Sequence, residues 1–191
     1  LPENFRAAGL LAAGLEADAL PGVDGHEAVL AGSCSKATLE QIERFEARHP
    51  GYAIDPLALA RGEGEVERAL VFAEEHLGRP FLISSSRPPE EVERVQAELG
   101  RERAGTLVED AMAQIARQLV ARGVRRLVVA GGETSGAVVG ALGIEALRIG
   151  PPIDPGVPWT LGSGETELLL ALKSGNFGAP DFFTKAFEAL R

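Results

Sequence analysis

The chain has 191 residues, of which 45% are hydrophobic and 25% are charged, and these values are typical of one globular domain with a sizeable core. Its formal net charge of −9 excludes a bulk polyanion such as nucleic acid as a partner, although a small anion can still bind where backbone N–H groups converge. No run approaches the roughly 18 apolar residues of a membrane helix, and the single cysteine, Cys34, cannot form an intrachain disulfide, so we expect a cytoplasmic protein without a membrane partner.

The first 26 residues are predicted to be a linker and a short helix that follow a missing N-terminal domain. The only methionine is Met112, so a natural start is not represented, and Pro2 suits the first turn of a helix. Residues 27–191 are then predicted to form one domain.

Short apolar runs alternate with amphipathic stretches through the first part of this domain. Leu39, Ile42 and Phe45 recur at helical spacing, and Pro88 and Pro89 suit the start of a later helix. We predict strands over residues 27–31, 52–59 and 80–84, the second of them broken by Pro56, and helices over residues 39–45, 66–73, 89–99 and 107–122.

The second part of the domain contains the clearest buried strand, the run RLVVA at residues 126–130. Because strands and helices alternate along the chain, we predict an α/β fold, a three-layer α/β/α sandwich with a mostly parallel or mixed central sheet. Residues 150–158, rich in proline and glycine, are predicted to be a structured turn region. The other predicted elements are a helix over residues 134–142, strands over residues 146–149, 159–161 and 167–172, and a closing helix over residues 181–190.

Three loops rich in glycine and serine each follow a predicted strand, at residues 32–35, 131–136 and 174–178. Ligands of open parallel sheets bind beyond the carboxyl ends of the strands, so we expect the three loops to line one crevice. Glycine lets a phosphate approach the backbone, and a helix start offers unpaired N–H donors. The spacing therefore predicts a phosphate site made largely of backbone.

Each loop also has a plain structural interpretation. Thr134 or Ser135 could be the N-cap of the helix after the second loop, Ser33 and Ser35 could cap the helix after the first, and the glycines of the third could only make turns. The common phosphate motifs G-x-x-x-x-G-K-[ST] and G-x-G-x-x-G after a strand are missing. From the spacing of these residues alone, we predict a phosphate-binding α/β domain and nothing more specific.

Four runs in a fixed order resemble the C-terminal nucleotide-binding domain of the four-carbon acid sugar kinases. They are GSCS at residues 32–35, GGETSG at 131–136, PGVPW at 155–159 and KSGNFG at 173–178. The resemblance implies a two-domain enzyme in which an N-terminal domain binds the sugar acid and this one binds ATP. Such kinases phosphorylate the 4-hydroxyl of 3-oxo-tetronate, threonate or erythronate. The general base and the sugar contacts would then lie in the absent domain, so we expect no catalytic residue in this chain and no activity from it alone.

The resemblance also implies which residues hold ATP and Mg²⁺. Glu133 is the candidate for orienting a metal-bound water or holding its loop, although it could merely favour a helix start. Lys173 could reach a phosphate as a point charge or extend to solvent. The resemblance does not identify which residues would coordinate the metal ion. The positions expected to contact ATP are Ser33, Ser35, Gly131, Gly132, Glu133, Thr134, Ser135, Lys173, Ser174, Gly175 and Asn176.

Three further features are expected to be structural. We expect Cys34 to be a small buried residue, Trp159 to belong to the core rather than to stack on adenine, and residues 84–87 to form a solvated loop rather than part of the crevice. The alternative function is a non-catalytic module that binds a nucleotide or another phosphorylated metabolite.

Overall fold

The computed structural model describes residues 19–164 and 166–190. The helix predicted near Pro2 therefore lies outside the described residues. Residues 19–24 are described and form no helix or strand.

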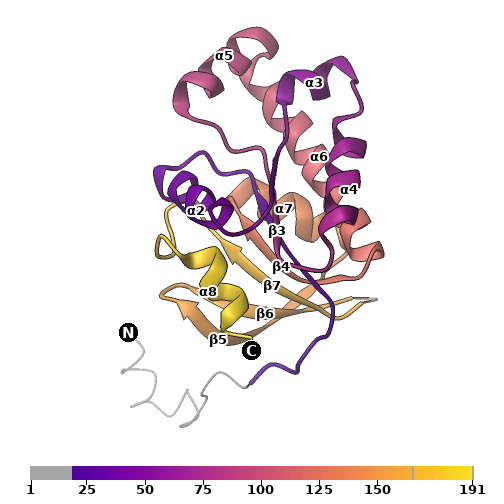
Figure 1. Cartoon of the computed structure of the whole chain (residues 1–191), viewed down its shortest axis with the longest axis vertical. Helices are drawn as coiled ribbons and strands as arrows, with labels where there is room; N and C mark the ends of the chain where they lie inside the picture. Colours follow the sequence, from indigo (N-terminus) through magenta and orange to yellow (C-terminus); the bar gives the residue numbers. More distant parts are fainter. Residues whose placement is uncertain (1–18, 165, 191) are drawn as a thin grey trace.

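A seven-stranded sheet forms the centre of the described part, in the order β2-β3-β1-β4-β7-β6-β5 (Figure 1). Neighbours from β2 through β7 run parallel, whereas β6 is antiparallel to both β7 and β5. The strands are β1 (His26–Ala31), β2 (Gly51–Ala53), β3 (Phe81–Ser84), β4 (Val124–Ala130), β5 (Ala146–Asp154), β6 (Val157–Ser163) and β7 (Leu168–Lys173). The helices are α2 (Lys36–Glu46), α3 (Pro56–Arg61), α4 (Glu65–His76), α5 (Pro89–Leu99), α6 (Arg101–Ala121), α7 (Gly132–Ala141) and α8 (Phe182–Glu188).

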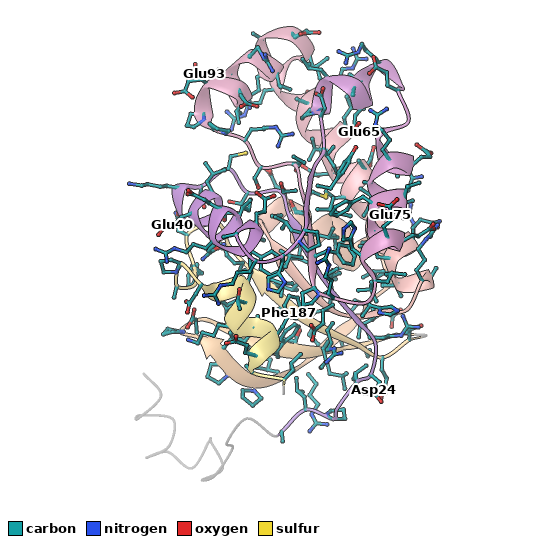
Figure 2. The ribbon with its side chains drawn as sticks, viewed as in Figure 1. Asp24, Glu40, Glu65, Glu75, Glu93 and Phe187 are labelled. Atoms are coloured by element: carbon teal, nitrogen blue, oxygen red, sulfur yellow. The ribbon has the colours of Figure 1, made fainter. Side chains whose placement is uncertain are left out.

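Both faces of the sheet are covered, as alternating side chains of β1 show. Ala28 and Leu30 belong to a core cluster with residues of α4, α6 and α7, while Val29 and Ala31 belong to a second cluster with α2 and α8. Phe187 of α8, labelled in Figure 2, is only 2% exposed and belongs to that second cluster. This arrangement confirms the predicted α/β architecture with its mostly parallel, mixed sheet.

Residues 52–59 do not form one broken strand. Only Gly51–Ala53 is a strand, and Pro56 is the first residue of α3 rather than an interruption. The Asp55 carboxylate accepts a hydrogen bond from the Leu57 N–H at 2.8 Å and so caps α3. Proline suits this position because its missing N–H would have no helical acceptor there.

Residues 150–158 form a β-hairpin, so the predicted structured turn is present, but it is much shorter than expected and the rest of the range is strand. β5 continues to Asp154 and β6 begins at Val157, which leaves only Pro155 and Gly156 between them. Gly156 has φ 82°, a left-handed conformation that favours glycine in tight turns. Prolines are tolerated in β5 because it is an edge strand of the sheet.

Different elements occupy the two ends of the molecule. Figure 1 shows α3 and α5 together at one end and the β5–β6 hairpin toward the other. Within the described ranges, no helix is both long and apolar enough to cross a membrane.

Candidate functional site

The three glycine-rich loops follow β1, β4 and β7, which are adjacent parallel strands. The first two loops are each hydrogen-bonded to the end of the neighbouring strand. The Gly32 N–H donates to the Ala130 carbonyl at 2.9 Å, and the Gly131 N–H donates to the Lys173 carbonyl at 2.9 Å. The sheet order therefore places the loops side by side along one edge.

The second loop leads directly into α7, which begins at Gly132. Its N-cap is Gly131, with φ 130°, and within the described chain no side chain caps the helix. Thr134 and Ser135 lie inside the first turn, so the interpretation of either as an N-cap is wrong. A helix start leaves its first N–H groups without intrahelical acceptors, so the amides of residues 132–134 are available to an anion.

Close packing between the loops requires glycine. A Cβ on Gly32 would lie 2.1 Å from the Thr134 hydroxyl oxygen, and one on Gly131 would lie 3.1 Å from the Ser33 nitrogen. A Cβ on Gly175 would lie 2.4 Å from the Ser33 hydroxyl oxygen. At Gly132, in contrast, an added Cβ would meet nothing within 4 Å. Gly132 therefore faces open space, whereas the other glycines let the loops touch.

The carbonyl of Gly175 ties the third loop to the first. It accepts hydrogen bonds from the Ser35 hydroxyl at 2.6 Å and the Thr38 hydroxyl at 3.0 Å. Ser35 also caps α2, because its oxygen accepts from the Thr38 N–H at 3.2 Å. The capping interpretation of Ser35 is therefore correct, and the same hydroxyl fixes the position of Gly175.

Lys173 is buried beneath these loops, with 1% of its surface exposed. Its ammonium donates to the Thr38 hydroxyl at 2.9 Å and to the Gly175 carbonyl at 3.0 Å, and both partners are neutral. No carboxylate of the described chain forms an ion pair with it, and burial lowers its pKa from 10.5 to about 8. The alternative in which its side chain extends to solvent is wrong.

The predicted site residues differ in how far solvent reaches them. Gly132, Glu133, Ser174 and Asn176 are exposed, whereas Gly131, Thr134 and Lys173 are buried. Ser33, Ser35, Ser135 and Gly175 are half-buried. The Ser135 hydroxyl oxygen is itself buried and has no hydrogen-bond partner in the described ranges.

A fourth loop, which follows β3, joins this edge. Ser84, Ser85 and Ser86 are at most 6% exposed, so the prediction of a solvated loop is wrong. The Ser85 N–H donates to the Ala31 carbonyl at 2.8 Å, and the Arg87 N–H donates to the Cys34 sulfur at 3.4 Å. The SSSR run after a buried strand was the available signal, since β3 is the direct neighbour of β1.

Cys34 is exposed, so its predicted burial is wrong. It lies in the first loop, where the chain leaves the buried strand β1 and turns toward α2. A cavity of about 170 Å³ adjoins it, bounded by the β1, β3 and β4 loops and by α5 and α6.

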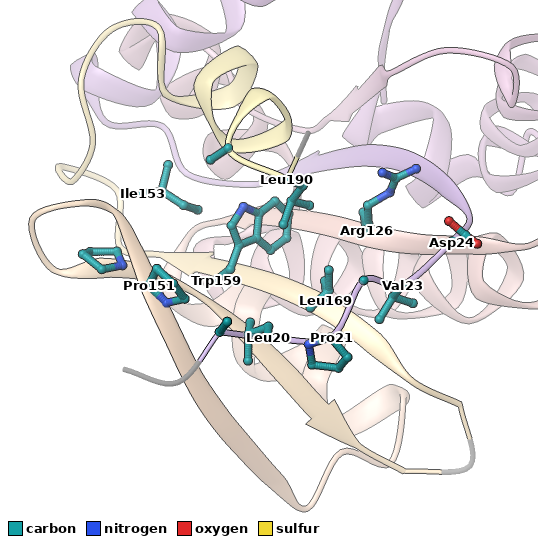
Figure 3. Close-up of a pocket in the computed structure, with 14 residues that line it drawn as sticks. Leu20, Pro21, Val23, Asp24, Arg126, Pro151, Ile153, Trp159, Leu169 and Leu190 are labelled. Atoms are coloured by element: carbon teal, nitrogen blue, oxygen red, sulfur yellow. The ribbon is translucent and has the colours of Figure 1, made fainter. Parts of the chain in front are cut away.

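A second cavity, of about 330 Å³, lies on the α8 face of the sheet, and its wall contains no residue of the loops that follow β1, β3, β4 and β7 (Figure 3). Trp159 lines it and is 3% exposed, and its indole N–H donates to the Ala186 carbonyl at 2.8 Å. The prediction that Trp159 belongs to the core is confirmed. Arg126, also in this wall, lies 3.2 Å from the Glu27 carboxylate and donates to the Gly25 carbonyl at 2.6 Å.

The described residues contain no group of three or more His, Cys, Asp or Glu side chains that could hold a metal ion. The metal ligands were left open by the sequence, and these residues do not supply such a group. Glu133, the predicted candidate for orienting a metal-bound water, is exposed in the first turn of α7.

Comparison with known proteins gives one family. Residues 28–183 match a family described as the nucleotide-binding C-terminal domain. The chain is 58% identical over 191 residues to a 3-oxo-tetronate kinase of Cupriavidus necator, and 59% identical over 191 residues to one of Pseudomonas fluorescens. Both alignments cover 100% of this chain and 44% of the relative, so the chain spans less than half the length of these relatives.

A solved structure has the same architecture. A crystal structure of a Haemophilus influenzae protein aligns with a TM-score of 0.86 and 34% identity. The alignment covers 91% of this chain and 42% of that protein.

Proposed function

Because the chain belongs to the family of nucleotide-binding C-terminal domains, in the branch shared with 3-oxo-tetronate kinases, we propose that it holds ATP for the phosphorylation of a four-carbon sugar acid. The phosphates would lie over the edge formed by the β1, β4 and β7 loops. The acceptor would be the 4-hydroxyl of 3-oxo-tetronate, threonate or erythronate.

Lys173 is the observation that carries this proposal. A charge removed from water is normally paired, because leaving it alone costs several kcal/mol. Lys173 is 1% exposed and has only neutral hydrogen-bond partners, at a sheet edge where parallel folds bind ligands. A polyphosphate placed there would supply the missing negative charge, even though the chain carries a net charge of −9.

Backbone donors would complete the phosphate site. The N–H groups of residues 132–134 start α7, where the helix dipole favours an anion. Gly132 has no atom within 4 Å of its missing Cβ, so a phosphate oxygen has room to approach. The half-buried Ser33 and the exposed Ser174 and Asn176 would add side-chain donors at the same edge.

Mg²⁺ fits this arrangement because it keeps several waters and usually takes one or two carboxylates plus the phosphates of the substrate. The exposed Glu133 carboxylate would be the protein group that contributes. When bound, the ion would neutralise charge on the phosphates. The chain's own part is to hold the β- and γ-phosphates in position, and phosphoryl transfer depends mainly on such positioning and charge stabilisation.

The remaining parts of the enzyme would lie in another domain. The curated relatives are more than twice as long as this chain, which leaves room for a domain that binds the sugar acid and supplies the general base. We place the enzyme in the cytoplasm, in keeping with a single unpaired cysteine. This chain alone would bind ATP without turning it over.

The variant Gly132→Val tests the phosphate site. Valine can fold at this position, because the added Cβ meets no atom within 4 Å, yet it occupies the space proposed for a phosphate. We expect calorimetric titration with ATP and Mg²⁺ to show at least about a tenfold loss of affinity, the order of one charge-assisted hydrogen bond. The thermal transition should stay within a few degrees of the parent.

Gly140→Val is the matched control, because Gly140 lies in the same helix, is exposed and also has nothing within 4 Å of its missing Cβ. It should bind ATP as the parent does. Gly175→Val is unsuitable, since its Cβ would collide with the Ser33 hydroxyl and disturb the fold itself. Unchanged ATP affinity in Gly132→Val would contradict the site.

A longer protein with both domains separates a kinase from a non-catalytic nucleotide-binding module. Incubation with ATP, Mg²⁺ and each four-carbon acid should yield a phosphorylated acid. If ATP binds and no acid is phosphorylated, the module is the correct function.

A further inference from the structure

Lys173 has one side-chain partner in the described ranges, and helix α2 supplies it. The ammonium donates to the Thr38 hydroxyl at 2.9 Å, and Thr38 is 0% exposed in the first turn of that helix. The two residues are 135 positions apart in the chain. The other partner is the Gly175 carbonyl, at 3.0 Å. One hydroxyl of α2 therefore reaches the buried ammonium beneath the loops.

The third loop has attachments to α2 that do not involve the Thr38 hydroxyl. The Gly175 carbonyl also accepts from the Ser35 hydroxyl, at 2.6 Å. Further along the loop, the Gln41 amide donates to the carbonyls of residues 177, 178 and 179 at 3.0–3.1 Å. The bond from Thr38 to Gly175, at 3.0 Å, is thus one of several that hold the loop. The lysine, in contrast, has no second hydroxyl to replace that of Thr38.

The Lys173 ammonium also has a donor to spare. An ammonium carries three N–H groups, and the described residues supply acceptors for two of them, at Thr38 and Gly175. Two fixed hydrogen bonds leave the third N–H little freedom of direction. A donor held in this way loses less side-chain freedom on binding than a mobile lysine does.

We propose that Thr38 is a positioning residue that holds the Lys173 ammonium in place for the phosphates of ATP, an inference that rests on the proposed function. The Thr38 oxygen accepts from the ammonium, while its own proton has the Gly175 carbonyl as acceptor. The lone pairs of that oxygen therefore stay directed at the charge. Thr38 would act through Lys173 and would not touch the nucleotide.

The same hydrogen bond should favour the charged form of Lys173. Burial lowers the pKa of this lysine to about 8, and no charged group of the described chain offsets the effect. Its neighbours are the Thr38 hydroxyl of α2, the Gly175 carbonyl of the third loop and Ala130 opposite it in β4, none of which titrates. Without the hydroxyl, the pKa should fall by about one more unit, the order of one hydrogen bond to a charged group.

The variant Thr38→Val removes the hydroxyl and keeps the branched shape, whereas Thr38→Ser keeps the hydroxyl. Calorimetric titrations with ATP and with inorganic tripolyphosphate, each with Mg²⁺, give the ratio of wild-type to variant affinity at pH 6.5 and 8.2. Ionisation of the ligand cancels in this ratio. For Thr38→Val the ratio should rise about fivefold between the two pH values, because its amine becomes neutral at lower pH. For Thr38→Ser it should stay close to one at both.

Ser35→Ala is the matched control. Ser35 donates to the same Gly175 carbonyl, and within the described ranges it makes no hydrogen bond to Lys173. Its loss should lower affinity by the same factor at both pH values. A purely structural effect of Thr38→Val would have that same form, so the pH dependence of the ratio distinguishes the two.

The outcomes separate the inference from the proposed function. If the wild-type chain binds neither ATP nor tripolyphosphate, the proposed function fails. If both bind, and Thr38→Val changes affinity by the same factor at both pH values or not at all, only the inference is overturned. If Thr38→Val does not fold, Thr38→Cys offers a similar volume with a weak acceptor and should show a smaller rise in the same direction. Failure of both variants to fold would mean that Thr38 serves the fold, and it would also overturn the inference.

Discussion

Two cationic side chains lie at opposite ends of the β4–β7 strand pair, and they differ in whether a carboxylate is paired with them. Arg126 faces Leu169 and Lys173 faces Ala130 in the register of β4 with β7. Arg126 is paired with Glu27 at 3.2 Å, beside the cavity of Figure 3. Lys173 has only a hydroxyl and a carbonyl as hydrogen-bond partners. The chain thus balances the Arg126 charge internally, whereas Lys173 has only neutral partners, and this difference is the basis for our proposal that the phosphates bind at the carboxyl end of the sheet.

Lys173→Met should give the largest effect. It removes the buried charge and keeps most of the side-chain volume, so affinity for ATP and for tripolyphosphate should fall about 100-fold, since hydrogen bonds to charged groups contribute about 1.5–3 kcal/mol. Titration calorimetry measures this loss. The thermal midpoint should not fall, because the Gly175 carbonyl keeps its hydrogen bonds from Ser35 and Thr38. If this variant loses stability but keeps its affinity for ATP, then Lys173 serves the fold rather than the ligand, and the contrast with Arg126 is wrong.

Arg126→Met is the charge-matched counterpart and should affect stability instead. It leaves the Glu27 carboxylate, which is 8% exposed, without the Arg126 guanidinium. We expect a loss of about 1–2 kcal/mol in the free energy of unfolding, less than for a fully buried pair because the Arg126 side chain is 23% exposed. Denaturant titration measures the loss, and ATP affinity should match that of the parent. If Arg126→Met lowers ATP affinity as much as Lys173→Met does, then the change in net charge alone explains the loss of affinity in both variants.

The sequence was sufficient to predict that the three glycine-rich loops meet at one edge of the sheet. Buried strands separated by helices predict a parallel sheet, and parallelism alone brings the loops after residues 31, 130 and 173 to one edge. The run GGETSG predicts a helix start, and α7 begins two residues earlier than expected, at Gly132. Local pattern is enough for these features because they depend on strand period, glycine and the geometry of helix ends.

Features that depend on packing between distant segments could not be predicted in this way. Lys173 is buried because α2 and the third loop close over the end of β7, which no local pattern records. Ser85 reaches the site because β3 is the neighbour of β1, a matter of strand order. The hairpin at residues 150–158 was missed because its prolines lie on an edge strand, where the usual objection to proline does not apply.

The pH dependence of binding and of stability should have opposite signs, and Lys173 is the cause of both. Burial lowers its pKa from 10.5 to about 8, so between these values the unfolded chain binds more protons than the folded one. The free energy of unfolding of the unliganded protein should therefore rise with pH across this window. Affinity should fall instead, because the neutral amine no longer attracts phosphate. The ATP phosphates stay ionised above pH 7.5, and the charged fraction of Lys173 falls about tenfold between pH 7.5 and 9, so the dissociation constant should rise about tenfold.

Titrations with ATP at pH 7.5, 8.2 and 9, with thermal unfolding under the same conditions, measure both slopes. Lys173→Met should flatten both, whereas Arg126→Met should keep both, because the Arg126 guanidinium stays charged throughout this range. A wild-type affinity independent of pH would mean that the Lys173 ammonium does not face the phosphates, and the contrast between the two ends of the β4–β7 pair would then concern packing alone. If affinity falls with pH and stability rises, the same buried amine must both destabilise the empty protein and attract the ligand. That combination is expected of a charge held in place for binding at the expense of folding stability.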